Sequence, residues 1–121
     1  MIINFTPTGM VPTKKLVPSV PISSVEIIEQ VQEANEKGIT LVHLHARDEN
    51  GTPASGITYF APILEGVRKH CPDLVICASL SGRNISDPVE RSEMLSLKPD
   101  MASLTLSSLN FPNQASVNSP E

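Results

Sequence analysis

The sequence predicts an α/β fold in which four parallel strands alternate with three helices. Four short apolar runs bounded by turn-forming residues have the length and composition of buried strands, at residues 2–6, 39–45, 74–78 and 101–106. Amphipathic stretches separate these runs. Because parallel neighbours need crossover connections, this order predicts either half of a barrel or a small open sheet.

The first two helices are predicted from their ends and their apolar faces. Ser23 and Glu26 have the spacing of a capping box, and apolar residues follow at helical intervals until Gly38 ends the pattern. The polar segment 47–56 reads as a loop. A second amphipathic helix follows it and is closed by Pro72.

The third helix is predicted to begin at Asp87 as N-cap, with Pro88 in its first turn. Residues 107–121 show no periodicity and are rich in Ser, Asn and Pro. We expect this segment to be a loop cut before its helix. Residues 1–121 therefore form one unit, which is too short for a complete β/α barrel of about 250 residues.

Composition excludes several classes of function. A net charge of −4 with scattered basic residues argues against a nucleic-acid partner. No apolar run approaches the roughly 20 residues of a membrane span, and the N-terminus lacks a basic signal-peptide region. We therefore expect a cytoplasmic protein without a membrane partner. Cys71 and Cys77 lack metal-site spacing, and we expect both to be reduced.

The strongest chemical signal is a His-x-His pair at the end of the second strand. His43 and His45 are two residues apart, so both side chains point to the same face of the sheet. Two imidazoles placed in this way can share a metal ion, although a catalytic zinc usually has three protein ligands. His70 belongs to a helix end and does not complete the set. The alternative is that each histidine is a hydrogen-bonded core residue.

Other polar residues follow the same strand ends. Arg47 keeps the parity of the histidines and could bind an anion or pair with a loop acid. Ser79, Ser81 and Ser103 lie at or just beyond the ends of the third and fourth strands, where β/α enzymes collect functional groups. Taken alone, each serine is better explained as a turn or loop residue.

Three blocks of sequence are more specific. They are Thr6-Pro7-Thr8-Gly9, Val42-His43-Leu44-His45-Ala46-Arg47-Asp48, and Met101-Ala102-Ser103-Leu104 leading on to Ser108-Leu109-Asn110-Phe111. Together they resemble the β-keto acid cleavage enzymes, a family that includes the 3-keto-5-aminohexanoate cleavage enzyme of lysine fermentation. The resemblance extends over essentially the whole chain.

The resemblance implies a zinc-dependent (β/α)8 TIM barrel that condenses a β-keto acid with acetyl-CoA, giving acetoacetate and a new CoA ester. Such enzymes are usually oligomeric. This chain would cover the first four strands and three helices, a half-barrel. The resemblance assigns His43 and His45 to the metal, and it assigns substrate contacts to four residues, Ser79, Ser103, Arg47 and Asn110.

The resemblance also places functional groups outside the chain. The third metal ligand, a glutamate, and the acid–base Arg and Asp come from later strands, so we expect the isolated chain to be inactive unless a second chain supplies the other half. Two departures from the family pattern concern the shape of the loop after the third strand and the substrate. Ser79-Leu80-Ser81-Gly82 replaces the usual Ser-Thr-Gly-Gly, and Met10-Val11 stands where some members have a glutamate, which suggests a less cationic substrate.

Two other interpretations remain. A metal-dependent hydrolase barrel also uses a His-x-His pair, but generally on its first strand rather than its second. A non-catalytic structural or interaction fragment is the second alternative. The intact mass of the source polypeptide, compared with 13.0 kDa, distinguishes a fragment from a complete protein.

Overall fold

The computed structural model describes residues 1–111 and 114–118. Its centre is a four-stranded sheet in the order β1-β2-β5-β6, in which every neighbouring pair is parallel. The strands are β1 (Asn4–Phe5), β2 (Leu41–Leu44), β5 (Val75–Ala78) and β6 (Met101–Ala102). The predicted α/β fold with parallel strands in chain order is confirmed.

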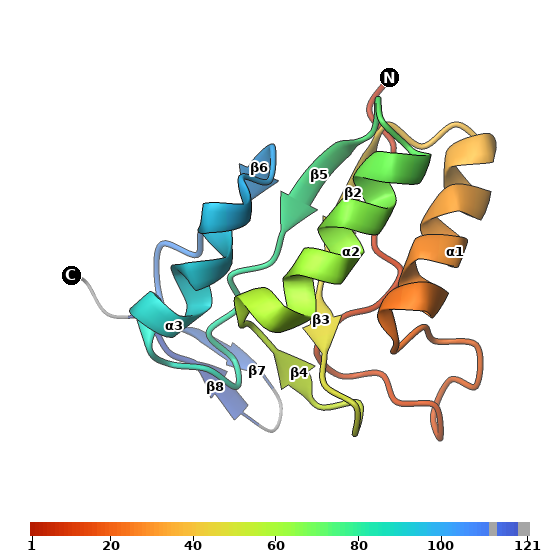
Figure 1. The fold of residues 1–121 in the computed structure, drawn as a ribbon. Coiled ribbons are helices and arrows are strands. Elements are labelled where there is room, and N and C mark those ends of the chain that lie inside the picture. The colour runs from red at the N-terminus through yellow and green to blue at the C-terminus, as the bar shows by residue number, and fades with distance from the viewer. Residues whose placement is uncertain (112–113, 119–121) are drawn as a thin grey trace.

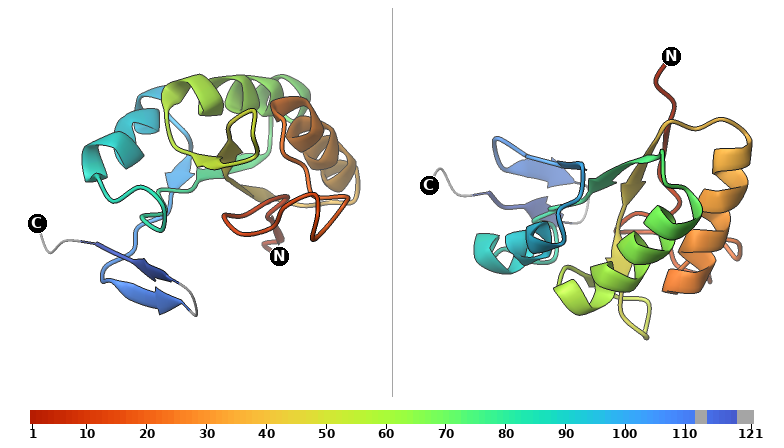
Figure 2. Two further views of the ribbon diagram at one scale, coloured as in Figure 1. Left: turned by 90° about the horizontal axis from the view of Figure 1, so that it is seen from below. Right: turned by 45° about the horizontal axis from the view of Figure 1, so that its top comes forward.

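Helices cover one face of this sheet (Figures 1 and 2). They are α1 (Ser24–Glu36), α2 (Ile57–His70), and α3 (Pro88–Ser92), which continues as the 3-10 helix η1 (Glu93–Leu97). Among the described residues no helix lies on the opposite face, which looks toward the loop before α1 and the C-terminal hairpin (Figure 2). No described helix is long and apolar enough to cross a membrane.

The core lies between the sheet and the helices. It contains Ile27 and Val31 of α1, Phe60, Ile63, Leu64 and Val67 of α2, Val42 and Leu44 of β2, and Ile76 and Ala78 of β5. Since side chains alternate along a strand, burial of Val42 and Leu44 against the helices turns His43 and His45 to the other face. Packing of β2 thus presents both histidines on the helix-free side.

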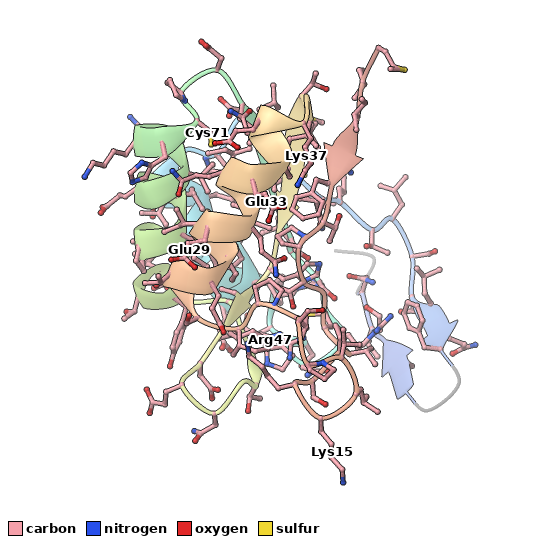
Figure 3. The ribbon with its side chains drawn as sticks, turned by 90° about the vertical axis from the view of Figure 1, so that its right-hand side faces the viewer. Lys15, Glu29, Glu33, Lys37, Arg47 and Cys71 are labelled. Carbon is pink, nitrogen blue, oxygen red and sulfur yellow. The ribbon has the colours of Figure 1, made fainter. Side chains whose placement is uncertain are left out.

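The predicted capping box begins α1. The hydroxyl of Ser23 accepts a hydrogen bond from the Glu26 backbone N–H at 3.2 Å, and the Glu26 carboxylate accepts one from the Ser23 N–H at 3.0 Å. The ammonium of Lys14, followed by the backbone N–H groups of Ile22 and Ser23, lowers the pKa of Glu26 to about 2. This contact fastens the proline-rich loop to the start of the helix. Figure 3 shows the charged outer side of α1, with Glu29, Glu33 and Lys37.

The fourth strand is shorter than predicted. Only Met101 and Ala102 pair with β5, whose own last residue is Ala78. Ser103 still donates its N–H to the Ala78 carbonyl, but Leu104 and Leu106 are 79% and 89% exposed. An apolar run alone does not make a strand where the neighbouring strand has ended.

Two predicted loops contain short hairpins. In the segment 47–56, β3 (Ala46–Arg47) pairs antiparallel with β4 (Pro53–Ala54) around Gly51, which has a positive φ of 79°. In the C-terminal segment, β7 (Leu109–Phe111) pairs with β8 (Gln114–Ser116). Residues 112–113 and 119–121 of the predicted loop lie outside the described residues. Strands this short have no apolar alternation that sequence reading could detect.

Candidate metal and substrate site

The two histidines lie side by side at the carboxyl end of β2. Their ring centroids are 5.1 Å apart, with the ring planes at 73°. His43 faces Cys77 of β5 in the strand register, and its Nδ1 lies 3.3 Å from the Cys77 Sγ. That contact occupies one ring nitrogen of His43 and leaves Nε2 for a ligand.

Burial keeps both imidazoles neutral at pH 7. Burial lowers the pKa of His43 below its ordinary value. It lowers the pKa of His45 to about 4, with smaller contributions from the positive charges of His43, Arg47 and Arg83. A neutral imidazole offers the lone pair that metal coordination requires.

The low pKa of His45 predicts a loss of stability in acid. In the unfolded state His45 has the ordinary pKa of 6.5, whereas in the folded state its pKa is about 4. Between these two pH values the unfolded state binds a proton that the folded state does not bind. Neutral His45 therefore makes its full contribution to the free energy of unfolding above pH 6.5. As the pH falls toward 4, the free energy of unfolding decreases by about 2–3 kcal/mol. Urea unfolding of the metal-free protein at pH 7.5 and pH 4 measures it. His45→Gln should show a decrease smaller by that amount, and equal decreases would contradict the prediction.

The spacing of the rings suits a shared metal ion. Imidazoles bound to one tetrahedral zinc have centroids about 5 Å apart, since the Zn–N distance is about 2.1 Å and each centroid lies about 1 Å farther. No group of three or more potential metal ligands occurs among the described residues. The donor set therefore fits a zinc ion but is incomplete, and His70, the last residue of α2, stays apart from it.

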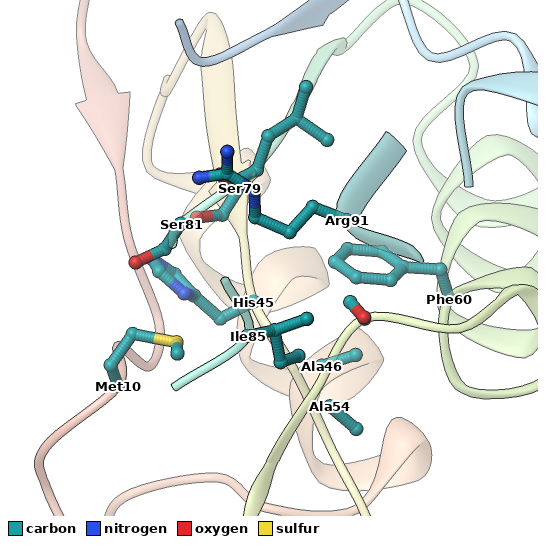
Figure 4. A pocket seen from close by; sticks show the side chains of 11 residues that line it. Met10, His45, Ala46, Ala54, Phe60, Ser79, Ser81, Ile85 and Arg91 are labelled. Atoms are coloured by element: carbon teal, nitrogen blue, oxygen red, sulfur yellow. The ribbon is translucent and has the colours of Figure 1, made fainter. Parts of the chain in front are cut away.

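A small pocket opens beside His45 (Figure 4). Its lining includes Met10 from the first loop, Ser79 and Ser81 from the loop after β5, and Arg91 from α3. The cavity is about 10 Å³, which is room for one water-sized group. Ser55 also lines it, and its buried hydroxyl has no hydrogen-bond partner among the described residues. An unpaired buried hydroxyl at a cavity is a group that a bound molecule can satisfy.

The two predicted serines have different surroundings. Ser79 is 7% exposed, lines the pocket with His45, and forms no hydrogen bond through its hydroxyl with the described part of the chain. The Ser103 hydroxyl accepts a hydrogen bond from the Leu80 N–H at 3.0 Å. Ser79 is thus available to a ligand, whereas Ser103 supports the loop that holds Ser79.

The Arg47 side chain is buried and donates hydrogen bonds to backbone carbonyls. Its Nη1 donates to the Gly51 carbonyl at 2.7 Å, and its Nη2 donates to the carbonyls of Gly9 and Pro12. Figure 3 shows Arg47 below α1, close to the loop that leads into it. It does not line the pocket with His45. The alternative of a surface arginine paired with a loop acid is therefore not what the structure shows.

Asn110 is exposed on β7 and is not among the residues that line the His45 pocket. The next residue, Phe111, lies under the guanidinium of Arg83, 3.6 Å from its ring centroid. This contact holds the C-terminal hairpin against the loop after β5. The structure thus brings His43 and His45 together, with Ser79 in the same pocket lining as His45, and Asn110 is not part of that lining.

Sequence reasoning missed Arg91. The side chain leaves α3 four residues after the N-cap and extends toward Ser79 and Ser81 (Figure 4). Nothing in the spacing of α3 shows which way a single arginine points, because α3 has no buried residue that would define its inner face. Only the packing of the helix against the loop reveals it.

Comparisons with known proteins identify the family of the chain. The family model described as beta-keto acid cleavage enzyme matches residues 1–121. The chain is 47% identical over 120 residues to 3-oxoadipate:acetyl-CoA acetyltransferase of Cupriavidus necator, covering 99% of this chain and 42% of that protein. It is 33% identical over 111 residues to the 3-keto-5-aminohexanoate cleavage enzyme of Fusobacterium nucleatum, covering 92% and 41%. The chain spans about two fifths of the length of these relatives.

Solved structures show the same fold. A ternary complex of ObcA with a C4-CoA adduct and oxalate matches with a TM-score of 0.71 over 85% of this chain and 27% of that one. A binary complex of ObcA with oxaloacetate gives 0.73 over 84% and 26%. Both are 21% identical in sequence and support the fold alone. With the family model matching every residue, this chain belongs to the beta-keto acid cleavage enzyme family.

Proposed function

We propose that the protein containing this chain condenses a β-keto acid with acetyl-CoA, giving acetoacetate and a new CoA ester, at a zinc site that includes His43 and His45. The observation that carries the proposal is the pair of neutral imidazoles 5.1 Å apart, beside a free serine hydroxyl, in a chain of this family. Acetyl-CoA as co-substrate is supported by the name of the Cupriavidus necator relative.

The chain's own residues have distinct roles in this proposal. His43 and His45 would hold the metal, and the Nε2 of His43 is the ring nitrogen left for it because Nδ1 contacts Cys77. Bound zinc would supply Lewis-acid stabilisation of negative charge on the substrate's keto oxygen. The Ser79 hydroxyl donates a hydrogen bond to an oxygen of the keto acid in the pocket that it lines with His45.

We further propose that these residues form half of a barrel. Among the described strands, β1 pairs only with β2 and β6 only with β5, so both sheet edges are open. The helix-free face that carries the histidines would be the inner face. Further strands, from the same protein or a second chain, would cover it and supply the third ligand and the acid–base groups. A cytoplasmic location and an oligomeric assembly belong to the same proposal.

The test follows carbon through the reaction. We expect the whole protein, given 3-oxoadipate and acetyl-CoA labelled with ¹³C at both acetyl carbons, to produce acetoacetate labelled at C3 and C4 and unlabelled succinyl-CoA. All eight carbons are then accounted for, since the six of the keto acid and the two of the acetyl group become the four of acetoacetate and the four of the succinyl group. Mass spectrometry measures both products.

The same assay on residues 1–121 alone tests the half-barrel. We expect no turnover, because an incomplete ligand set and missing acid–base groups leave the reaction without its catalysts. Turnover by this segment at an ordinary enzymatic rate, about 1 s⁻¹ or more, would contradict the half-barrel. Release of unlabelled acetoacetate, or hydrolysis of acetyl-CoA alone, would instead contradict the proposed reaction.

A further inference from the structure

Arg91 lies between two cavities. It lines the small pocket that contains His45 and Ser79. It also lines a larger cavity of about 250 Å³, together with Ser103, Thr105 and Asn118. A molecule bound against His45 and long enough to pass Arg91 would enter this second cavity.

The Arg91 guanidinium is anchored by hydrogen bonds through only one of its nitrogens. Its Nη1 donates to the Asn118 side-chain oxygen at 2.7 Å and lies 3.5 Å from the Leu80 carbonyl. Within the described part of the chain, Nε and Nη2 form no hydrogen bond. An arginine anchored through one nitrogen has its remaining donors oriented for a ligand, and a carboxylate matches their geometry.

Gly82 makes room for this arrangement. A Cβ atom at position 82 would lie 2.2 Å from the Arg91 Nη1 and 2.9 Å from the Val117 carbonyl oxygen. A side chain at this position would displace the guanidinium and would also press against the backbone at Val117. The glycine therefore lets the guanidinium lie directly over the backbone of the loop that carries Ser79 and Ser81.

The charge around both cavities has one sign. Neither lining includes an aspartate or glutamate, although the chain as a whole carries a net charge of −4. Arg91 is the only lysine or arginine in either lining. Met10, which lines the pocket beside His45, adds no charge that would attract a cationic substrate.

We propose that Arg91 binds a second carboxylate, at the far end of a dicarboxylic β-keto acid whose reacting end lies against His45 and Ser79. The inference rests on the proposed function and adds the substrate class and the residue that selects it. Ser103 and Thr105 line the space that the far end would occupy. A phosphate of CoA is the other anionic group that could reach Arg91, and the experiment separates the two.

The experiment compares 3-oxoadipate with 3-oxohexanoate, which has the same chain length and no second carboxylate. The whole protein and its Arg91→Gln variant are assayed with each acid and acetyl-CoA. We expect Arg91→Gln to reduce the ratio of kcat/KM for the two acids about 10- to 100-fold, chiefly through the KM for 3-oxoadipate. Arg91→Lys keeps the positive charge, so it should reduce this ratio less than Arg91→Gln does. Lys69→Gln, which removes a positive charge from the exposed side of α2, should leave the ratio unchanged.

An unchanged ratio of kcat/KM in Arg91→Gln would overturn the role of Arg91, whether the activity with both acids is kept or is lost equally. If the KM for acetyl-CoA also increases, the unchanged ratio assigns Arg91 to a CoA phosphate instead. If the wild-type protein turns over neither acid, the proposed function fails. The role of Arg91 is then tested by measuring how tightly the protein binds adipate and hexanoate. Calorimetry should then show adipate binding at least about 10-fold more tightly than hexanoate, with the preference lost in Arg91→Gln. Equal binding of adipate and hexanoate by the wild type would reject the inference.

Discussion

Replacing His43 and His45 together with alanine is expected to abolish zinc binding. The proposed site has only these two ligands within the described residues, and both imidazoles are neutral and close enough to share one ion. Loss of a group that merely orients a ligand costs about 10- to 100-fold in metal affinity, so loss of two direct ligands should cost well over about 100-fold. Metal content after dialysis, and a chelator competition titration, measure the effect.

The matched control is His70→Ala. His70 is exposed at the end of α2, away from the sheet face that carries the pair, so its removal should leave zinc content near that of the wild type. The double variant must also keep the far-ultraviolet circular dichroism of the wild type. Stoichiometric zinc in a folded double variant would show that the metal lies elsewhere and that the two histidines are core residues.

Much of this site could be predicted because it depends on strand periodicity. The alternation in β2 places Val42 and Leu44 in the core, and the same period of two puts His43 and His45 together on the other face. Ser79 could be anticipated in the same way, because parallel strands end at one edge of a sheet and Ser79 follows β5 directly.

The rest depends on contacts that no local pattern records. Arg47 lies two residues after His45, so strand alternation alone would place its side chain on the same face as the histidines. The chain leaves the parallel sheet after Leu44, however, and Arg47 belongs to a separate hairpin. Its partners at positions 9 and 12 are far from it in sequence. Arg91 likewise depends on how α3 lies over the loop after β5. Side chains that bridge loops are set by packing between distant segments, which a single sequence does not display.

The second large effect is expected from Arg47→Met, which keeps most of the side-chain volume and removes the donors. The buried guanidinium of Arg47 donates to the carbonyls of three partly buried residues, Gly9, Pro12 and Gly51. Without it these acceptors lose their side-chain partner, and leaving buried polar groups unsatisfied costs about 1–3 kcal/mol for each. Because the loops can move to admit water, we expect a total loss of about 3 kcal/mol in the free energy of unfolding.

Arg68→Met is the control for this prediction, since Arg68 also donates to two backbone carbonyls, those of Leu97 and Lys98, but is exposed. Its replacement should cost about 1 kcal/mol or less, because water can solvate the released carbonyls. Urea unfolding measures both variants, and hydrogen exchange should show faster opening around residues 9–12 in Arg47→Met alone. Equal losses of stability in the two variants would contradict the stabilising role of Arg47.

If Arg47→Met keeps its stability but raises the KM for the keto acid, Arg47 is instead a substrate-binding residue, as the family resemblance implies. Its hydrogen bonds to the carbonyls are then replaced by hydrogen bonds to the ligand.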